Sequence, residues 1–344
     1  MTTLHRLELD DPVWASFVGM HRKATAFHEP AWAKLLAECY GGRGFALATF
    51  NGNGGIVAGI PVIERKAPVT RRRRWFSLPF TDHCAPLVTE VHTEAQFAAR
   101  LEETRLAGGV DRIEVRSRLT LERGQHVTSA VRQTLPLESD SDAVFRRLSK
   151  SQVQRNIGRA RRAGVVVRTA ERAEDLDRVF FDLQLETRRR LGVPIQPRRF
   201  YTLLWRRLLE PGHGFLLLAY HDSLPIGGAV FLRANGTLTY KYGASLKSHW
   251  PLRANALIFW TAIEHACDTG AEILDFGRTE MRHESLRTFK RNWGSEETPL
   301  THTILGRRVK VHSETPRAAV ERVIRRSPPW VCRAIGEGLY KYAS

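Results

Sequence analysis

Three short apolar runs follow one another between residues 214 and 245, and they restrict the possible folds of this chain more than any other feature. The runs are GFLLLAYH, PIGGAVFLRA and TLTYKYGAS, joined by HDSL and by the hairpin dipeptide NG. Helical patterns precede them at residues 173–192 and 197–212. A helix at 251–270, a strand, a short helix and a last strand follow. A strand meander flanked by helices predicts a mixed α/β domain.

The first half of the chain shows the same order of elements. A helical pattern at residues 30–41 precedes three strand-like runs, ALATF, GIVAGIPVIE and RWFSLPF, and a helix and a strand follow. We therefore predict an α/β fold with mixed sheets (α+β), built as two similar domains in tandem. The predicted boundaries are 1–140, 141–312 with the active site, and a helical tail at 313–344. A chain of 344 residues suits two domains of ordinary size.

The chain is strongly basic, with a formal net charge of +17 and a pI near 10.4. Such a balance indicates a polyanionic partner, either nucleic acid, a nucleotide-linked substrate or an anionic membrane touched peripherally. A solvated arginine surface is the alternative. The start of the chain lacks a signal-peptide pattern, and no run of 18 apolar residues occurs, so we expect a cytoplasmic protein without a transmembrane segment. The four cysteines and thirteen histidines are scattered, and we expect no disulfide framework and no metal.

One predicted helix concentrates this charge. Arg155, Arg159 and Arg162 recur at helical spacing, and an apolar face opposes them, formed by Val153, Ile157 and Ala160. We predict that the arginine face binds a phosphate backbone, with a solvated face as the alternative. The RRRR run at residues 71–74 adds a second basic patch.

A short helix near residue 290 places a cation beside an apolar stripe. Leu286, Phe289 and Trp293 are three and four residues apart, and Lys290 lies next to them. A buried ammonium needs a carboxylate, a cavity or an escape to solvent. Either Lys290 serves a site, or it pairs with Asp275 or Glu284 and holds the helix to the sheet.

The helix at residues 173–192 begins as a core stripe and ends polar. The stripe is Leu176, Phe180, Leu183, Thr187 and Arg190. A stripe that turns polar often reaches a cavity, where a guanidinium can clamp a phosphate or carboxylate. Three consecutive arginines leave open which of Arg188, Arg189 and Arg190 enters the site, and arginines that complement the helix dipole are the alternative.

Two tyrosines alternate in the third run of the meander. Strict alternation puts Tyr240 and Tyr242 on one face of the strand and Lys241 on the other. Tyr242 is a candidate cleft residue, and core packing is the alternative.

The order of elements is that of the GCN5-related N-acetyltransferase (GNAT) fold, and two such units in tandem resemble the Fem family of aminoacyl-tRNA-dependent peptidyltransferases. The resemblance covers roughly residues 10 to 310. It depends on FHEPAW, SLPFTDHCAPL, QRNIGRARRAGV, ETRRRLGVP, PIGGAVFL, TYKYGAS, LDFGR and FKRNWG. The FK-x-x-WG ending after LDFG is its most specific part.

The resemblance implies a set of roles. Lys290, in the FK pair with Phe289, would stabilise the oxyanion of the aminoacyl ester, and Asp275 would orient it or accept a proton. Thr187 with Arg189 or Arg190 would bind the diphosphate or peptide end of the acceptor. Charged tRNA would be the co-substrate, with no further cofactor. The R/Q-x-x-G-x-G/A loop of acetyl-CoA-dependent relatives is missing from KSHWPLRANALIFW, which makes acyl-CoA a less favoured donor.

These expectations define the predicted function. We expect an acyltransferase that moves an aminoacyl group from charged tRNA to an amine and forms a peptide or amide bond on a cell-wall precursor or small metabolite. One alternative is an N-acyltransferase that uses a thioester donor on a sugar or exopolysaccharide precursor. Another is a non-catalytic RNA-binding protein. The sequence leaves the donor, the acceptor and the oligomeric state open.

Overall fold

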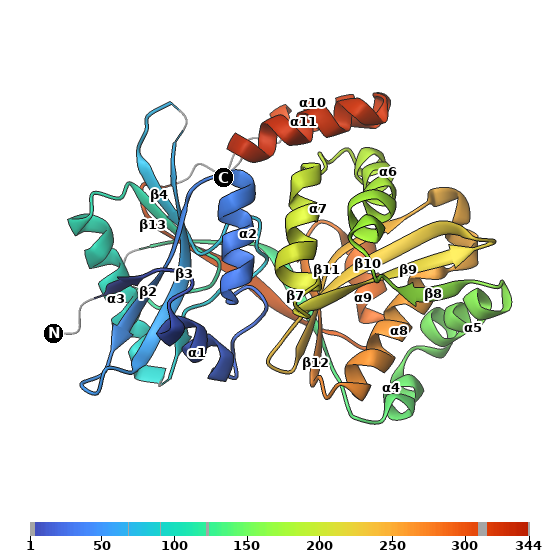
Figure 1. Ribbon diagram of the computed structural model, residues 1–344, viewed down its shortest axis with the longest axis horizontal. Coiled ribbons are helices and arrows are strands. Elements are labelled where there is room, and N and C mark those ends of the chain that lie inside the picture. The colour runs from blue at the N-terminus through green and yellow to red at the C-terminus, as the bar shows by residue number, and fades with distance from the viewer. Residues whose placement is uncertain (1–3, 68, 90, 122–123, 309–314, 343–344) are drawn as a thin grey trace. The chain divides into compact units, whose positions relative to one another are not determined.

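The protein folds into two compact units of mixed α/β structure (Figure 1). A computed structural model describes residues 4–67, 69–89, 91–121, 124–308 and 315–342. Unit 1 comprises Met1–Arg132 and Thr298–Val311, and unit 2 comprises Gln133–Glu297 and His312–Ala343. The chain passes from unit 1 to unit 2 within strand β7 (Gln125–Pro136) and returns within β13 (Glu296–Gly306).

Unit 1 contains a mostly antiparallel sheet with helices against it. Its strands run in the order β1-β2-β3-β4-β6-β13, with β5 paired to β3, and only the described pairing of β4 with β6 is parallel. The elements are β1 (His5–Leu7), α1 (Pro12–Met20), α2 (Pro30–Tyr40), β2 (Arg43–Phe50), β3 (Ile56–Lys66), β4 (Arg73–Phe76), β5 (Leu87–Val88), α3 (Val91–Ala107) and β6 (Arg112–Val115). One apolar core includes Phe97 and Leu101 of α3, and a second includes Trp14 of α1.

Unit 2 contains the predicted meander with a parallel strand added. Its strands run in the order β12-β11-β10-β9-β8, antiparallel except for β11 with β12. The elements up to β11 are α4 (Ser141–Arg147), η1 (Lys150–Gln154), α5 (Arg155–Arg162), β8 (Val166–Thr169), η2 (Asp175–Phe180), α6 (Phe181–Leu191), α7 (Arg198–Leu204), η3 (Trp205–Leu209), β9 (Gly214–His221), β10 (Leu224–Ala234) and β11 (Thr237–Ser245). The later elements are η4 (Lys247–Leu252), α8 (Ala254–Asp268), β12 (Ile273–Glu280), α9 (Glu284–Arg291), α10 (Thr315–Arg326) and α11 (Pro329–Tyr342).

Helix α8 is the centre of the core of unit 2. Its sequence ALIFWTAI is apolar all round, which is typical of a helix buried on several sides. Phe259 packs in the interior against the rings of Tyr240, Phe276, Phe289 and Trp293, with centroids 4.8 to 5.9 Å apart. This cluster fixes β11, β12 and α9 against one helix, and it therefore positions the segment around Lys290.

The parallel contact between β11 and β12 is short. It runs from Thr237 opposite Ile273 to Thr239 opposite Asp275, and within the described residues it continues no further. The last residues of β11 therefore pair only with β10. The carboxyl end of β11 is left beside the start of α8, which creates space for a site.

The element order confirms the predicted mixed α/β fold with two similar units. The division into units differs from the expected boundaries at 140 and 312, because the end of β13 pairs with β6, with Thr303 opposite Val115. The expected tail forms α10 and α11 and belongs to unit 2, and its residues 313–314 and 343–344 lie outside the described residues. Helix α1 and strand β1 were not predicted. None of the described helices combines the length and hydropathy that a membrane span requires.

Candidate functional site

A cavity of about 300 Å³ opens in unit 2 at the carboxyl end of β11. Helix α8 begins at its wall, and the first residues of that helix, Ala254, Asn255 and Ala256, belong to the lining. The lining side chains come from five segments. They are Gln152, Val153, Asn156, Ile226, Ser245, Leu246, His249, Trp250, Arg253, Ala254, Asn255, Ala256, Phe289, Asn292 and Trp293.

A β-bulge in β11 sets the orientation of the side chains that lead to this cavity. Tyr242 lies opposite Val230 and Tyr240 lies opposite Phe231, although Val230 and Phe231 are consecutive on β10, so Lys241 is the extra residue of the bulge. Tyr240 packs against Phe259 of α8 at 4.8 Å between ring centroids, whereas Tyr242 packs against Phe200 of α7 at 5.7 Å. The prediction that both tyrosines share a face is therefore wrong.

Lys290 is buried and binds the neighbouring strand. Its side chain is only 2% exposed, and Nζ donates to Phe276 O at 2.7 Å, to Thr279 Oγ1 at 2.7 Å and to Gly277 O at 3.4 Å. An ammonium has three protons, and these three oxygens can accept all of them. Its neighbours Phe289 and Trp293 line the cavity, while Lys290 itself is directed to β12.

Asp275 stabilises the same turn of backbone. The residue is buried, and its Oδ1 accepts a hydrogen bond of 2.7 Å from Gly277 N. Gly277 has a φ of +69°, a conformation that favours glycine. This conformation explains the glycine of the LDFGR stretch. Asp275 and Lys290 thus hold opposite polar groups of one irregular segment, the amide and the carbonyl of Gly277.

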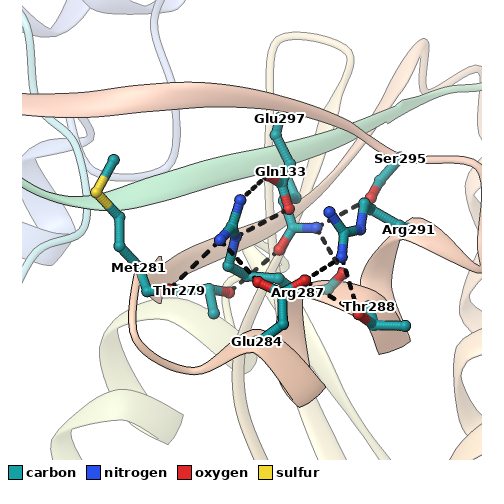
Figure 2. A network of polar contacts seen from close by, with 9 residues as sticks. All are labelled: Gln133, Thr279, Met281, Glu284, Arg287, Thr288, Arg291, Ser295 and Glu297. Atoms are coloured by element: carbon teal, nitrogen blue, oxygen red, sulfur yellow. Dashed lines mark hydrogen bonds and ion pairs between the residues drawn. The ribbon is translucent and has the colours of Figure 1, made fainter.

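A polar network anchors α9 to Gln133 of β7 and to Glu297 of β13 (Figure 2). Thr279 Oγ1 donates to Gln133 Oε1 at 3.3 Å, and Gln133 Nε2 donates to Arg287 O at 3.0 Å. Arg287 also pairs with Glu297 at 2.7 Å and with Glu284 at 2.9 Å. Because Thr279 also accepts from Lys290, the network is continuous from the ammonium to the surface of unit 2.

The predicted stripe on α9 is only partly buried. Trp293 is buried and Phe289 packs against the core, but Leu286 is 40% exposed. The prediction for Leu286 is wrong because α9 contacts the core only through its last turn. The alternative pairing of Lys290 with Glu284 is not observed, since Glu284 accepts from Arg287 and Arg291 instead.

The three arginines at the end of α6 point to different places. Arg190 lies over the ring of Trp250 at 4.5 Å and donates to Ser245 O at 3.5 Å, and both partners line the cavity. Arg189 donates to Ser327 O and to Glu186. Arg188 turns inward, where its Nε lies 3.0 Å from the Gln184 amide oxygen in the orientation that satisfies both groups. Only Arg190 therefore approaches the cavity.

The apolar part of the stripe, which begins in η2 and continues in α6, is buried as predicted. Leu176, Phe180 and Leu183 are buried. Thr187 is buried too, and its Oγ1 accepts from Ser245 N at 3.0 Å while it donates to Ser245 O at 3.3 Å. These two hydrogen bonds to Ser245 fix the last residue of β11. Thr187 therefore acts on the cavity through Ser245.

Helix α5 forms a wall of the cavity and also carries the basic face. Gln152, Val153 and Asn156 line the cavity, and Arg155 and Arg159 are exposed on the same helical segment. Arg162 is exposed one turn later. The predicted opposite face is confirmed, since Val153, Ile157 and Ala160 are all buried. The arginine run at 71–74 is less available than expected, because Arg72 pairs with Asp111 and Arg73 with Glu64.

A second polar cluster lies in unit 1 around the loop at residues 77–87. Two side chains of the FHEPAW stretch hold this loop: His28 Nε2 lies 2.8 Å from Ala85 O, and Trp32 Nε1 donates to Thr81 Oγ1 at 2.9 Å. Leu78 and Phe80 have φ values of 66° and 58°, an uncommon conformation for these residues. The resemblance includes both FHEPAW and SLPFTDHCAPL, but nothing in the sequence indicates that these two stretches contact each other.

Two histidines of this cluster are neutral. Burial lowers the pKa of His28 to about 4 and that of His83 to about 3, and the charge of Arg132 lowers the pKa of His83 further. His28 Nδ1 accepts from Thr25 N at 3.0 Å, which leaves Nε2 to carry the proton toward Ala85 O. Among the described residues no group of three or more His, Cys, Asp or Glu side chains is arranged to hold a metal.

Comparison with known proteins places this architecture. Residues 147–291 match the model of an acetyltransferase (GNAT) domain. The structure is similar to that of FemX, with a TM-score of 0.72, 14% identity, and coverage of 87% of this chain and 96% of the other. No curated protein matches the sequence.

Two further solved structures share the fold. One is the C-terminal domain of a putative lysylphosphatidylglycerol synthetase from Agrobacterium fabrum, with a TM-score of 0.56, 12% identity and coverage of 91% and 96% of the two chains. The other is L-PGS from Bacillus licheniformis, with a TM-score of 0.52, 12% identity and coverage of 93% and 98%. At these identities the likeness shows the fold. The protein therefore has the Fem-like arrangement of the GNAT fold, with the matched acetyltransferase domain in unit 2.

Proposed function

We propose that this protein is an acyltransferase that takes an aminoacyl group from charged tRNA and transfers it to an amine in the cavity of unit 2. The balance of the step is simple. The amine nitrogen attacks the ester carbonyl, an amide bond forms, the ester bond breaks, and the ribose hydroxyl of the tRNA leaves with one proton. The acetyltransferase domain and the fold shared with FemX support the acyltransferase part of the proposal.

One observation supports the tRNA donor above all others: the helix with the basic face is also a wall of the cavity. Arg155 and Arg159 lie within one turn of Asn156, which lines the cavity. A phosphate backbone bound along α5 would bring a nucleic-acid end to this opening. The positive end of the α8 dipole at the same wall would favour a phosphodiester group near the aminoacylated end of the tRNA.

Lys290 would act as a fixed positive charge. The three oxygens on β12 hold the ammonium in place, so its contribution in this geometry is electrostatic and does not require a further hydrogen bond. Asp275 would position the Gly277 turn that the ammonium binds. Phe289 would form a side of the cavity, and Arg190, stacked on Trp250, would add a second cation to Arg253 of the lining for an acidic acceptor.

The decisive experiment supplies labelled charged tRNA and an extract of amine metabolites to the purified protein. We expect label to appear in an amide product, and RNase treatment of the tRNA should abolish the product. Absence of both transfer and accelerated deacylation would contradict the proposal. RNase-resistant activity with an acyl thioester would favour the N-acyltransferase alternative, and tRNA binding without any transfer would favour a non-catalytic RNA-binding protein.

A charge-matched pair of variants tests the role of α5. Arg155→Gln/Arg159→Gln/Arg162→Gln should raise the KM for charged tRNA with little effect on kcat. It should also reduce the slope of log affinity against log salt by about 2 to 3, one counterion-releasing contact per arginine. The control Arg178→Gln/Arg206→Gln/Arg322→Gln removes the same charge from exposed positions elsewhere. Equal effects of both variants would mean that α5 is not the tRNA surface.

A further inference from the structure

Helices α10 and α11 are each bound to unit 2 along one side. In α10, Ile324 is buried and Arg325 donates to Leu191 O at 3.2 Å. In α11, Cys332 is buried and Tyr340 donates to Pro194 O at 3.3 Å. Gly336 lies between them on the same side, where a Cβ would overlap the carbonyl group of Ile195. The inner side of both helices is therefore fixed by α6 and the segment that follows it.

The outer side of these helices exposes large apolar residues. Trp330 is 68% exposed and Val323 is 51% exposed. Val320 and Leu339 are exposed at their flanks. Val323 is one residue from Ile324 in a helix, about 100° round the axis, and thus lies to the side of the contact with α6. Trp330 is two residues from Cys332, about 200° round the axis, and thus points away from the contact of α11.

Arginines lie among these apolar groups. Arg322 and Arg326 are exposed, one residue before and three residues after Val323, which places them beside it on the outer side of α10. Arg325 and Arg333 are compensated by Glu321 and Glu337 within the helices. The charge that remains on the outer side is positive and close to the exposed apolar groups.

We propose that the outer side of α10 and α11 docks on an anionic lipid surface. Aliphatic side chains and a tryptophan would enter the boundary between headgroups and acyl chains, while Arg322 and Arg326 would bind lipid phosphates. A protein partner fits less well, because the centre of a protein interface is depleted of charge whereas here arginines flank Val323 directly. The inference does not depend on the proposed transfer reaction.

The test uses flotation of the full chain with vesicles of phosphatidylcholine alone or with phosphatidylglycerol added. We expect binding to the anionic vesicles and little binding to the neutral ones. Val323→Ser/Trp330→Ser should weaken binding to anionic vesicles about tenfold or more, since each side chain loses its apolar transfer energy. Each of Arg322→Gln and Arg326→Gln should weaken binding about fivefold.

Matched controls separate this surface from the general positive charge of the chain. Met20→Ser/Leu106→Ser removes two apolar side chains that are 76% and 63% exposed in unit 1, and it should leave binding unchanged. Arg178→Gln/Arg206→Gln removes two charges elsewhere and should have a smaller effect than the double variant Arg322→Gln/Arg326→Gln on α10. Thermal unfolding checks that every variant is folded.

Depth-dependent quenching gives an independent readout. Phospholipids brominated on their acyl chains should quench part of the tryptophan fluorescence of the bound protein, and Trp330→Phe should remove that part. Equal binding by the α10–α11 variants and their controls would overturn the proposal. So would binding without quenching, which means adsorption by charge alone, or a dimer that Trp330→Ser dissociates, which means that the surface joins two copies.

Discussion

His28 in unit 1 and Lys290 in unit 2 solve the same structural problem with different chemistry. Each is a polar side chain on or beside a helix, each is buried, and each binds backbone groups of an irregular segment. His28 faces one carbonyl and one amide, of Ala85 and Thr25. Lys290 donates to three oxygens, on Phe276, Gly277 and Thr279.

The difference follows from the polarity of the backbone that each residue must match. A neutral imidazole offers one donor and one acceptor, which fits the loop at 77–87, and burial keeps its pKa low. A segment that presents three oxygens requires three donors, which an ammonium has and an imidazole lacks. In unit 2 the buried Lys290 therefore meets three acceptors beside the cavity, while His28 in unit 1 meets one acceptor and one donor.

The comparison is tested most strongly by Lys290→Met. The substitution leaves the oxygens of β12 without their donor, so we expect the free energy of unfolding of unit 2 to fall by about 3 kcal/mol. Hydrogen exchange of the β12 and α9 amides under native conditions measures the loss. Transfer of the aminoacyl group should also be lost.

Arg291→Met is the control for this change, because Arg291 is on the same helix but pairs with Glu284 at the surface. It should leave both stability and transfer nearly unchanged. If the β12 and α9 amides of Lys290→Met exchange as slowly as those of the parent chain, the contacts on β12 do not stabilise unit 2. The comparison between His28 and Lys290 would then fail.

His28→Leu should have the next largest effect. It leaves Ala85 O without a donor and Thr25 N without an acceptor, and we expect a loss of about 2 to 3 kcal/mol in unit 1. Urea denaturation measures it, with His5→Leu at an exposed position as the control. Equal midpoints for the two variants would show that the loop at 77–87 is held by other contacts.

The lowered pKa values of the two histidines in unit 1 also predict a pH dependence of stability. The pKa values of His28 and His83 in the folded state, about 4 and about 3, lie below their ordinary 6.5, so the unfolded chain binds more protons between these limits. Stability is therefore highest above about pH 6.5 and falls as the pH falls toward 4, by about 1.4 kcal/mol per pH unit for each histidine. Urea midpoints between pH 7 and pH 4.5 measure the slope.

A double variant isolates the contribution of the two histidines to this slope. His28→Asn/His83→Asn should unfold at lower urea concentration at pH 7, and its midpoint should depend less on pH than that of the parent chain. An unchanged slope would mean that folding does not lower the pKa of the two imidazoles.

Gln133→Leu gives the smallest expected effect and sharpens the picture of unit 2. Gln133 is fully buried and links Thr279, the acceptor of Lys290, to Arg287 O. We expect a loss of about 1 to 2 kcal/mol. A double-mutant cycle with Thr279→Val measures the coupling, and additive losses would show that Gln133 and Thr279 stabilise the unit separately.

Much of unit 2 follows from periodicity in the sequence. The stripe on α6 and the two faces of α5 have long repeats at helical spacing, and the structure confirms both. The prediction that Leu286 is buried is wrong, because an eight-residue helix has too few turns for its pattern to show where the contact with the core ends.

Other features depend on contacts between distant segments. The bulge at Lys241 leaves no mark in the letters TLTYKYGAS, because the extra residue is defined only by what lies opposite on β10. The bond from His28 to Ala85 joins residues 57 positions apart. The role of Lys290 was predicted from a resemblance, and its three partners lie 11 to 14 positions away on β12, a contact that the local pattern does not encode.

The extra residue at position 241 makes the length of β11 as important as its composition. Removing a single residue there would restore strict alternation, and every side chain before the deletion would exchange layers relative to those after it. Either Tyr240 would leave the rings around Phe259, or Ser245 would turn away from Thr187 and Trp250. Homologous chains that keep this geometry should therefore tolerate substitutions in the segment far better than a gap of one.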